Sequence, residues 1–382
     1  MKLGQLIEAA KVGRAGTEAY PLLSMTMRQG LIPQGEKFKK RVAGADLSQY
    51  KVVQKDQLVV GFPIDEAVLA FQRTVPAGIV SPAYAVWNLK NRSATDPAYL
   101  ERFLRSPLAI EYYKAKLQGS TARRRSLPNP IFLDMEVPYP PVREQRRIAA
   151  ILDKADELRA KRRQAIAHLD ALTQSIFHNV GSLASGSARS KLSDVCSHIQ
   201  TGPFGSLLHK EDYVVGGIPL VNPMHIRNGR VATDASFSVT ETKFSELKSY
   251  RLLPGDIVLG RRGELGRCAE VVDSDGPLLC GTGSLIVRPS LQHISPTYLS
   301  ATLSSKSTRR RLEELAQGAT MPNLNTKIVG NLDIAVPPIE LQQAFATRVA
   351  AVERLKETHR KHLAELDALF ASLQSRAFKG EL

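Results

Sequence analysis

One segment of this sequence occurs twice and divides the chain into two halves. The copies are residues 138–177 and residues 336–373. Asp170 aligns with Asp367, the difference 367 − 170 is 197, and the long segments align at this offset without a gap. Each copy begins with a Pro-Pro pair. Because proline is tolerated in the first turn of a helix but not in its interior, each pair marks the start of a long charged helix. We therefore expect two equivalent long helices, one after each half of the protein.

Both copies carry the heptad spacing of a coiled coil, with apolar or small residues at alternating steps of three and four. The expected seam of the first copy is Ile148, Ile151, Ala155, Leu158, Arg162, Ala165, Leu169, Leu172 and Ile176, and that of the second is Phe345, Arg348, Val352, Leu355, His359, His362, Leu366, Leu369 and Leu373. Polar residues in a seam cost stability but can set the register, and we assign this role to Arg162, His359 and His362. The alternative, a metal shared by the two histidines, is the weaker interpretation.

The sequences before the two helices are also related. Tyr99 aligns with Tyr298 and Gly119 with Gly318, both at an offset of 199. The chain is thus a duplication in the order domain, helix, domain, helix, and residues 179–189, rich in Gly, Ser and Ala, read as the linker between the halves. Two copies are too few for a solenoid.

An amphipathic helix must bury its apolar stripe, and the partner at hand for each copy is the other copy. Two helices related by a two-fold axis would pack antiparallel, with one globular domain at each end. A helix of about 36 residues is about 54 Å long. One turn of B-DNA measures about 34 Å. The helices are therefore long enough to serve as a spacer between two DNA-reading domains.

The charge of the chain favours a polyanionic partner. Its 382 residues carry a formal net charge of +15, which favours nucleic acid first and an anionic membrane second. The sequence contains neither a membrane-spanning apolar run nor the apolar core of a signal peptide, so we expect a cytoplasmic protein. The three cysteines are far apart, form no CxxC pair, and are expected to be buried thiols.

Basic and amide residues cluster in segments rich in Gly, Ser, Thr and Asn. Arg and Lys neutralise phosphates, and Arg, Lys, Asn and Gln read base edges. The preferred DNA-reading loops are 260–267 and 317–326 in the second half, with 24–30 and 119–129 as their counterparts. The candidate DNA-binding residues are Thr26, Arg28, Lys37, Lys39, Lys40, Arg41, Ser120, Arg123, Arg124, Arg125, Asn222, Arg227, Arg261, Arg262, Arg267, Thr320, Asn323 and Asn325. Any one basic run taken alone is better explained as a solvated face than as a DNA site, and the occurrence of several runs in such segments is what favours DNA.

Local patterns in the first half predict several elements. We expect strands within residues 21–27, 57–62, 78–89 and 131–140, a short helix at 6–10, and one helix over 96–119. Asp96 is the expected N-cap of that helix, with Pro97 at its first position.

An ordered set of motifs resembles the specificity subunits of type I restriction-modification systems. The motifs are the Pro140, Pro141, Glu144, Gln145 start of the first long helix, its repeat PPIELQ, GPFGS at 202–206, PGDIVL, QGATMPNLNT and the C-terminal AFKGEL. The sequence departs from the pattern at Leu341, where the repeat would have Glu, and the first domain lacks GPFGS. We therefore expect the N-terminal third of the first domain to be built differently.

The resemblance implies an α+β protein: two mixed α/β target recognition domains in tandem, separated by two long antiparallel coiled-coil helices with pseudo-two-fold symmetry. The expected segments are 1–139 (domain 1), 140–180 (helix 1), 181–190 (linker), 191–336 (domain 2) and 337–382 (helix 2 and tail). The helix residues expected to dock subunits or form the spacer are Gln145, Ile148, Leu158, Leu169, Leu172, Gln342, Phe345, Leu355, Leu366 and Leu369.

The resemblance also implies a function. A specificity subunit is a non-catalytic DNA-binding scaffold that reads a bipartite target in double-stranded DNA. Its expected partners are two modification subunits, which are adenine methyltransferases, and restriction subunits with motor and nuclease that join through them. This chain would bind no cofactor or metal, since S-adenosylmethionine belongs to the modification subunit. The expected setting is the cytoplasm of a bacterium or archaeon.

Two other classes of function stay open. For a fused methyltransferase or nuclease, the sequence lacks a P-loop, an Asn/Asp-Pro-Pro-aromatic tetrapeptide, HExxH, CxxC and an EF-hand loop, and GTGS at 281–284 is far weaker than a dinucleotide fingerprint. The other class is a coiled-coil scaffold that binds only protein. Salt separates it from a DNA-binding protein, whose affinity falls linearly with log salt.

Overall fold

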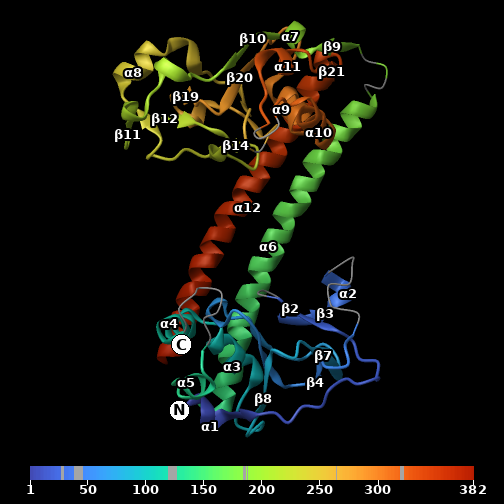
Figure 1. The fold of residues 1–382 in the computed structure, drawn as a ribbon, viewed down its shortest axis with the longest axis vertical. Coiled ribbons are helices and arrows are strands. Elements are labelled where there is room, and N and C mark those ends of the chain that lie inside the picture. The colour runs from blue at the N-terminus through green and yellow to red at the C-terminus, as the bar shows by residue number, and fades with distance from the viewer. Residues whose placement is uncertain are drawn as a thin grey trace. The chain divides into compact units, whose positions relative to one another are not determined.

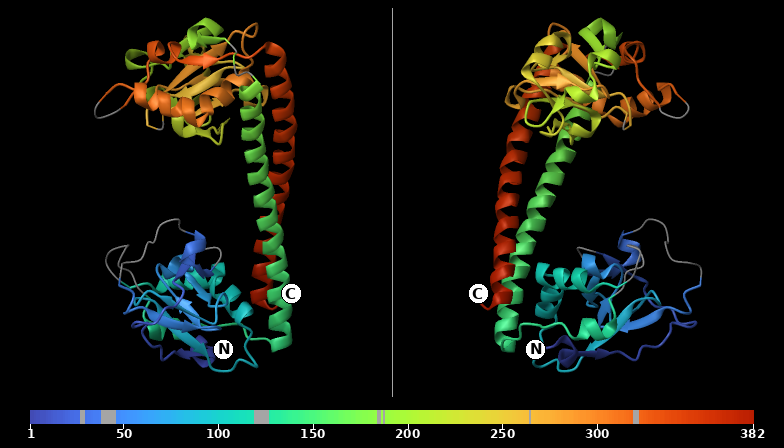
Figure 2. Two further views of the ribbon diagram at one scale, coloured as in Figure 1. Left: turned by 90° about the vertical axis from the view of Figure 1, so that its right-hand side faces the viewer. Right: turned by 60° about the vertical axis from the view of Figure 1, so that its left-hand side comes forward.

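The computed structural model describes residues 1–26, 30–37, 46–118, 127–183, 186, 188–263, 265–318 and 322–382, with the backbone alone at 36, 37, 182 and 183. The chain divides into two units: unit 1 comprises Met1–Gln164 and Arg360–Leu382, and unit 2 comprises Ala165–His359. Each unit therefore holds one globular domain together with parts of both long helices (Figures 1 and 2).

The two long helices are α6 (Val142–Leu183) and α12 (Ile339–Lys379). Each begins directly after its Pro-Pro pair, as the sequence predicts. In unit 1 the start of α6 lies beside the end of α12, and in unit 2 the end of α6 lies beside the start of α12, so the helices are antiparallel in both (Figure 1). The predicted fold class, mixed domains joined to paired long helices, is confirmed. Within the described ranges, none of the helices combines the length and hydrophobicity that a membrane span requires.

The domain of unit 1 is built on an antiparallel sheet in the order β1-β8-β5-β6. These strands are β1 (Ile7–Ala9), β8 (Ala85–Leu89), β5 (Leu58–Val60) and β6 (Leu69–Phe71). Two further antiparallel pairs are β2 (Leu23–Thr26) with β3 (Gly30–Pro33) and β4 (Lys51–Gln54) with β7 (Ala77–Val80). The helices are α1 (Leu3–Leu6), α2 (Gln34–Lys37), η1 (Ile64–Glu66), α3 (Pro97–Leu104), α4 (Pro107–Lys116) and α5 (Asn129–Leu133). One core joins Leu58 and Trp87 of the sheet, Tyr99 of α3, and Leu152 of α6.

The domain of unit 2 repeats this sheet as β10-β20-β17-β18. The strands are β10 (Cys196–Thr201), β20 (Ser284–Pro289), β17 (Ile257–Gly260) and β18 (Cys268–Glu270). A second sheet has the order β11-β15-β12-β19-β16, from β11 (Tyr213–Val214), β15 (Ser238–Val239), β12 (Ile218–Val221), β19 (Leu278–Cys280) and β16 (Arg251–Leu252), and its β12–β19 pair is parallel. It lies on the side of the domain away from α12 (Figure 1).

The remaining elements of unit 2 are short. The strand pairs are β9 (Arg189–Lys191) with β21 (Asp333–Ala335) and β13 (Ile226–Arg227) with β14 (Arg230–Val231). The helices are α7 (Leu192–Val195), α8 (Glu241–Glu246), α9 (Pro296–Ser304), α10 (Lys306–Leu315) and α11 (Thr326–Gly330), with 3-10 turns η3 (Gly205–Leu207), η4 (Lys210–Asp212), η5 (Pro223–His225), η6 (Lys248–Tyr250) and η7 (Asp273–Asp275).

The duplication read from the sequence is therefore a duplication of structure. In both units a short helix leads into the first sheet strand, three more strands of that sheet follow, and three helices precede the long one. The domains differ in what is inserted between the first and second sheet strands. Unit 2 carries most of its second sheet there, whereas unit 1 carries the β2–β3 pair and β4, and β4 pairs with β7, which follows β6 in the sequence. The N-terminal third of unit 1 is therefore built differently.

Three local predictions are wrong. Residues 6–10 do not form a helix, because β1 pairs with β8 and this pairing overrides local propensity. The helix predicted over 96–119 is two helices: Ser106 caps α4, accepting a hydrogen bond from the Ala109 amide at 3.3 Å, and Pro107 stops the preceding helix. Residues 131–140 hold the end of α5 and a single bridge, Lys2 to Glu136, in place of a strand. The Asp96 cap is confirmed by its bond from the Tyr99 amide, 2.9 Å.

Every second predicted seam residue does lie in the seam. At the other positions, the residue in the seam is the next one toward the C-terminus. Ile148, Ala155, Phe345 and Val352 are buried as expected. Leu158, Leu172, Leu355 and Leu369, however, are 42%, 45%, 54% and 49% exposed. Their C-terminal neighbours lie in the seam, among them Arg159, half-buried, and Lys356, buried. The sequence interpretation assigned apolar residues to these seam positions. Long basic side chains occupy them instead, because their aliphatic stems can be buried while their charged ends bind partners.

Candidate nucleic-acid interface

Four turns of the second domain meet around residues 281–283, the turn between β19 and β20. Thr282 Oγ1 donates a hydrogen bond to the Pro203 carbonyl at 2.8 Å. The Gly283 amide donates to Asn222 Oδ1 at 3.1 Å, and the Gly283 carbonyl accepts from the Arg261 amide at 2.9 Å. We call this assembly of turns 202–206, 222–225, 260–267 and 281–283 the turn platform.

Glycine is required where these turns touch. A Cβ on Gly202 would lie 2.0 Å from the Gly281 carbonyl oxygen, and one on Gly281 would lie 2.3 Å from Asn222 Oδ1. Neither neighbour has room to move, since both belong to the hydrogen-bonded platform. The glycines of GPFGS and GTGS thus serve close turn-to-turn packing, which agrees with the weak reading of GTGS as a nucleotide fingerprint.

Residues 322–324 are fastened to the platform by Arg261. The Arg261 carbonyl accepts from the Leu324 amide at 3.0 Å, and its Nε donates to Asn323 Oδ1 at 3.1 Å. Arg261 is buried, and desolvation together with the charge of Arg262 lowers its pKa. Arg261 and Asn323 join the two predicted reading loops to each other, and their role as direct DNA contacts stays a prediction. The sequence shows that both loops carry polar residues, but not that these residues pair.

Asn222, Asn325 and Thr26 likewise have structural partners, and their DNA contacts stay predictions. Asn222 Oδ1 is occupied by the Gly283 amide, and Asn325 caps α11 by accepting from the Ile328 amide at 2.8 Å. Thr26 of unit 1 is buried and its hydroxyl donates to the Gly30 carbonyl at 3.0 Å, across the β2–β3 hairpin. Short polar side chains satisfy turn and cap backbones as readily as they bind ligands.

Other side chains of these turns and of the neighbouring hairpin are partly or fully exposed, and Arg227 Nε donates to the Met224 carbonyl at 3.3 Å. Arg262 and Arg227 are exposed, and Arg267 is half-buried with Nη1 3.4 Å from the Pro223 carbonyl. Two large apolar residues, Phe204 and Met224, are also exposed here, at 59% and 50%. Charged residues in the sequence do not point to Phe204 or Met224. The one sequence feature that indicates them is a bulky residue inside a turn that contains Gly or Pro. The platform thus presents cations and apolar tips on a rigid base, the mixture that contacts phosphates and thymine methyl groups.

A hollow of about 440 Å³ adjoins the platform. It is lined by Gly263, Leu265, Arg267, Arg309, Glu313 and Pro322. The basic run of residues 309–311 lies on α10, where Arg310 and Arg311 pair with Glu314 of the same helix. Arg310 and Arg311 are therefore explained as part of a solvated helix face.

Most candidates of the first domain lie outside the described residues. These are Arg28, Lys39, Lys40, Arg41, Ser120, Arg123, Arg124 and Arg125, together with Thr320 of the second domain. Lys37 ends α2, and only its backbone is described. Their assignment to DNA binding stays a prediction.

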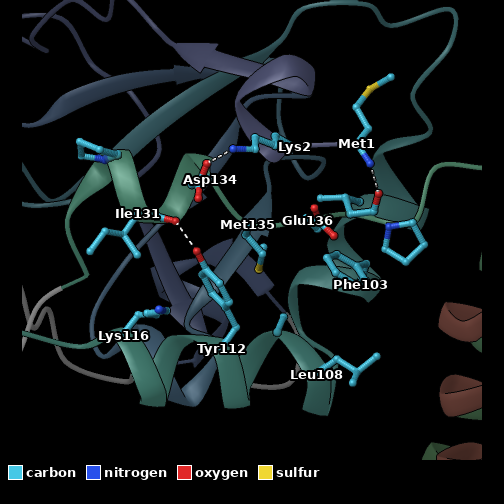
Figure 3. A pocket seen from close by; sticks show the side chains of 14 residues that line it. Met1, Lys2, Phe103, Leu108, Tyr112, Lys116, Ile131, Asp134, Met135 and Glu136 are labelled. Atoms are coloured by element: carbon cyan, nitrogen blue, oxygen red, sulfur yellow. Dashed lines mark hydrogen bonds and ion pairs between the residues drawn. The ribbon is translucent and has the colours of Figure 1, made fainter.

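A larger cavity of about 1090 Å³ opens in unit 1 between the N-terminus, α4 and α5 (Figure 3). Its groups bind one another: Lys2 pairs with Asp134, Tyr112 Oη donates to the Ile131 carbonyl at 2.8 Å, and the Met1 amino group donates to the Val137 carbonyl at 2.9 Å. None of its 14 lining residues is a candidate DNA contact.

A buried glutamine fastens each domain to its long helix. Gln145 accepts from the Asp96 amide at 2.9 Å and donates to the carbonyls of Ala94, at 3.1 Å, and Pro140, at 2.8 Å. In unit 2, Gln342 makes the equivalent three bonds, to the Ser295 amide (2.8 Å) and the carbonyls of His293 (3.1 Å) and Pro337 (2.8 Å). Both side chains are fully buried. Gln145, Gln342, Ile148 and Phe345 are covered within their own units, whereas Leu169 and Leu366 are half-buried. Which of these residues dock other subunits stays a prediction.

The helices of each unit are joined by equivalent ion pairs. Arg159 Nε lies 2.6 Å from Asp367 Oδ1 in unit 1, and Lys356 Nζ lies 2.6 Å from Asp170 Oδ1 in unit 2. The differences 356 − 159 and 367 − 170 are both 197, so the duplication preserves the pair. Arg159 also stacks on the Phe370 ring, 4.3 Å from its centroid.

These pairs are interhelical contacts that the sequence interpretation did not choose. The register role of Arg162, His359 and His362 stays a prediction, and both His362 and its neighbour Leu363 are half-buried. His362 Nδ1 is buried without a hydrogen-bond partner. Among the described residues, no cluster of three or more His, Cys, Asp or Glu side chains is arranged to hold a metal.

Comparison with known proteins identifies a family domain in the chain. Residues 185–368 match the type I restriction modification DNA specificity domain. The specificity subunit of the type I restriction enzyme MjaVIII from Methanocaldococcus jannaschii is 22% identical over 328 residues, which are 80% of this chain and 74% of that protein. The EcoBI specificity subunit from Escherichia coli is 25% identical over 175 residues, 45% of this chain and 37% of that protein.

Solved structures share the fold. The S subunit of a type I restriction-modification system from M. genitalium superposes with a TM-score of 0.58 at 16% identity, covering 99% of this chain and 95% of that one. A chain from a study of type I R-M complex assembly gives a TM-score of 0.56 at 18% identity, covering 100% and 97%. Residues 185–368 are therefore a type I restriction modification DNA specificity domain, and the whole chain has the fold of a type I restriction-modification S subunit.

Proposed function

We propose that this chain reads a bipartite DNA target, with one half-site for each globular domain, and performs no catalysis itself. The observation that carries the proposal is the duplicated attachment: in each unit a similar domain is held on its long helix by a buried glutamine with the same three bonds. Two similar domains attached in the same way are suited to two similar tasks. We assign residues 1–139 and 191–336 to the two recognition domains and the long helices to the spacer.

The turn platform supports a DNA-facing role for the second domain. Its base is held by backbone bonds, so side chains on it keep their positions when DNA approaches, which lowers the entropic cost of binding. Arg262 and Arg227 would contact phosphates or guanine edges. Phe204 and Met224 would contact thymine methyl groups or base steps.

The long helices carry two equivalent apolar patches, which supports two copies of one partner. Each unit exposes one leucine from each helix: Leu158 and Leu369 in unit 1, and Leu355 and Leu172 in unit 2. The differences 355 − 158 and 369 − 172 are both 197, so the patches are copies of each other. Covering one leucine contributes about 1.5 to 3 kcal/mol. We assign the patches to two modification subunits, which would bind S-adenosylmethionine and methylate adenine, with restriction subunits joining through them.

A docking experiment tests this assignment. The full chain carrying Leu355→Glu is mixed with the modification subunit, and the mass of the complex is measured by light scattering after gel filtration. We expect one modification subunit in place of two, and the same from Leu158→Glu. Ala350→Glu, at an exposed position of α12, is the matched control and should bind two. Two copies bound by both leucine variants would refute the assignment.

A DNA experiment tests the reading function. DNA exposed to the assembled methylase is sequenced for methylated adenines, and two short specific motifs at constant spacing are the expected result. Binding measured against salt should give a slope of several units. A flat salt response would favour a protein-only scaffold, and methylation by this chain alone with S-adenosylmethionine would favour a fused enzyme.

A further inference from the structure

Unit 2 contains a charged connection between a hairpin of the recognition domain and the spacer helix. Arg230 of β14 reaches α12, where its Nη2 lies 2.6 Å from Glu353 Oε2 and its Nη1 lies 3.2 Å from Glu357 Oε2. The two carboxylates are four residues apart and therefore lie on one face of the helix. One planar guanidinium thus bridges two successive turns, a geometry that restrains orientation as well as distance.

The connection continues into the seam between the helices. Glu353 also pairs with Lys356, and Lys356 pairs with Asp170 of α6 at 2.6 Å. Lys356 is buried at the helix–helix contact. The four groups Arg230, Glu353, Lys356 and Asp170 form a chain of alternating charge from the hairpin, through α12, to α6. We call it the charge network.

The network is charged at neutral pH. Burial works against the cation, but hydrogen bonds and charge from Glu353 and Glu357 outweigh it and raise the pKa of Arg230. Burial also opposes the ionisation of Glu353, but hydrogen bonds from Lys356 and Arg230 outweigh this effect and lower the pKa of Glu353. Both partners therefore hold their charges over the range in which the protein works.

The hairpin that Arg230 fastens also carries a candidate DNA contact. Arg227 pairs with Arg230 across the β13–β14 ladder, and Arg227 is exposed. The connecting residues Asn228 and Gly229 have φ of 52° and 72°, the tight two-residue turn that keeps both strands in fixed register. Displacing Arg230 would therefore displace Arg227 with it.

The first domain is fastened by other means. The position equivalent to Arg230 at the offset of 199 is Leu31, a buried residue. Unit 1 instead places Arg102 of α3 against Asp153 and Asp156 of α6, at 2.8 and 3.0 Å. Among the residues that the structure describes, a charged hairpin-to-spacer connection is thus found in the second domain and not in the first.

We propose that Arg230 is a positioning residue for the second half-site: through the charge network it sets the orientation of the β13–β14 hairpin on the spacer helix, and thereby the base pairs that Arg227 and the adjoining turn meet. The inference rests on the proposed function, in that the second domain must read DNA. It predicts a defect confined to one half-site.

The test uses the full chain assembled with the modification subunit and DNA carrying single base changes in either half-site. For Arg230→Ala we expect discrimination at the second half-site to fall about 3- to 5-fold, the range for loss of a partly exposed ion-pair network. Discrimination at the first half-site should not change. Arg230→Lys, which can keep one ion pair, should fall between wild type and Arg230→Ala. Arg310→Ala, an exposed arginine paired only within α10, should match wild type.

Two results would overturn the inference. Equal loss at both half-sites, or a lower melting temperature with unchanged discrimination, would mean that Arg230 only stabilises the fold. Wild-type protein that ignores base changes in the second half-site would instead overturn the proposed function, and the role of Arg230 with it. A normal wild-type response with a normal Arg230→Ala response removes the role of Arg230 alone.

Discussion

Replacing Gln342 with leucine should detach the second domain locally from its long helix. Leucine fills a similar volume but makes none of the three hydrogen bonds, so the Ser295 amide and the carbonyls of His293 and Pro337 lose their partner. An unsatisfied buried polar group costs about 1 to 3 kcal/mol. Water can reach two of these groups, since only the Pro337 bond is buried at both ends. We therefore take about 1 kcal/mol for each and expect about 3 kcal/mol in total.

Hydrogen exchange measures this loss where it occurs. A local cost of about 3 kcal/mol corresponds to roughly 100-fold faster exchange of the Ser295 amide. Exchange is preferable to a global unfolding curve, because a chain of two units need not unfold in one step. Gln343→Leu, at the exposed neighbouring position, is the matched control and should leave the exchange unchanged.

The equivalent change in unit 1 provides a second control. Gln145→Leu should accelerate exchange of the Asp96 amide and leave Ser295 protected, because the two glutamines serve different units. If Gln342→Leu changes exchange at Ser295 by less than about 3-fold, or about 0.6 kcal/mol, the glutamine is not what holds the domain, and the argument for duplicated attachment fails.

Two further predictions concern pH and DNA. Burial raises the pKa of the Cys268 thiol to about 11 and also raises that of Cys280, so the folded state keeps both protons above the unfolded value of about 8.5. Their contribution to stability is therefore complete below about pH 8.5 and is lost as pH rises toward the folded pKa. The urea midpoint of unfolding should fall between pH 8 and pH 10, and it should fall less in Cys268→Ala. An identical fall in the variant would exclude this thiol as a cause. On the turn platform, Arg262→Ala should lower the slope of log affinity against log salt by about 1, whereas Phe204→Ala should weaken binding at an unchanged slope; fluorescence anisotropy over a salt series checks both, and reversed slopes would contradict the assigned contacts.

Features that depend on neighbouring residues could be predicted from the sequence alone. The Pro-Pro pairs mark where α6 and α12 begin, because the proline ring is incompatible with a helix interior whatever surrounds it. The Asp96 cap, confirmed at 2.9 Å, rests on a side chain that bonds an amide three residues away. The duplication, visible as offsets of 197 and 199, predicted that the same frame occurs twice. The exact membership of the DNA interface in the first domain remains a prediction.

Features that depend on contacts distant in sequence were decided by the tertiary structure. Leu158 and Leu355 look like seam residues and are exposed, because Arg159 and Lys356 find an aspartate on the opposing helix 208 and 186 residues away (367 − 159 and 356 − 170). Arg261 was predicted only as a DNA contact, and the structure adds that it links two loops, because Asn323 accepts a hydrogen bond from it. The partner of a charged side chain determines whether that side chain is buried, and the periodicity of one helix does not reveal the partner. The long helices were thus predictable as elements, whereas the faces they bury and the faces they leave exposed were not.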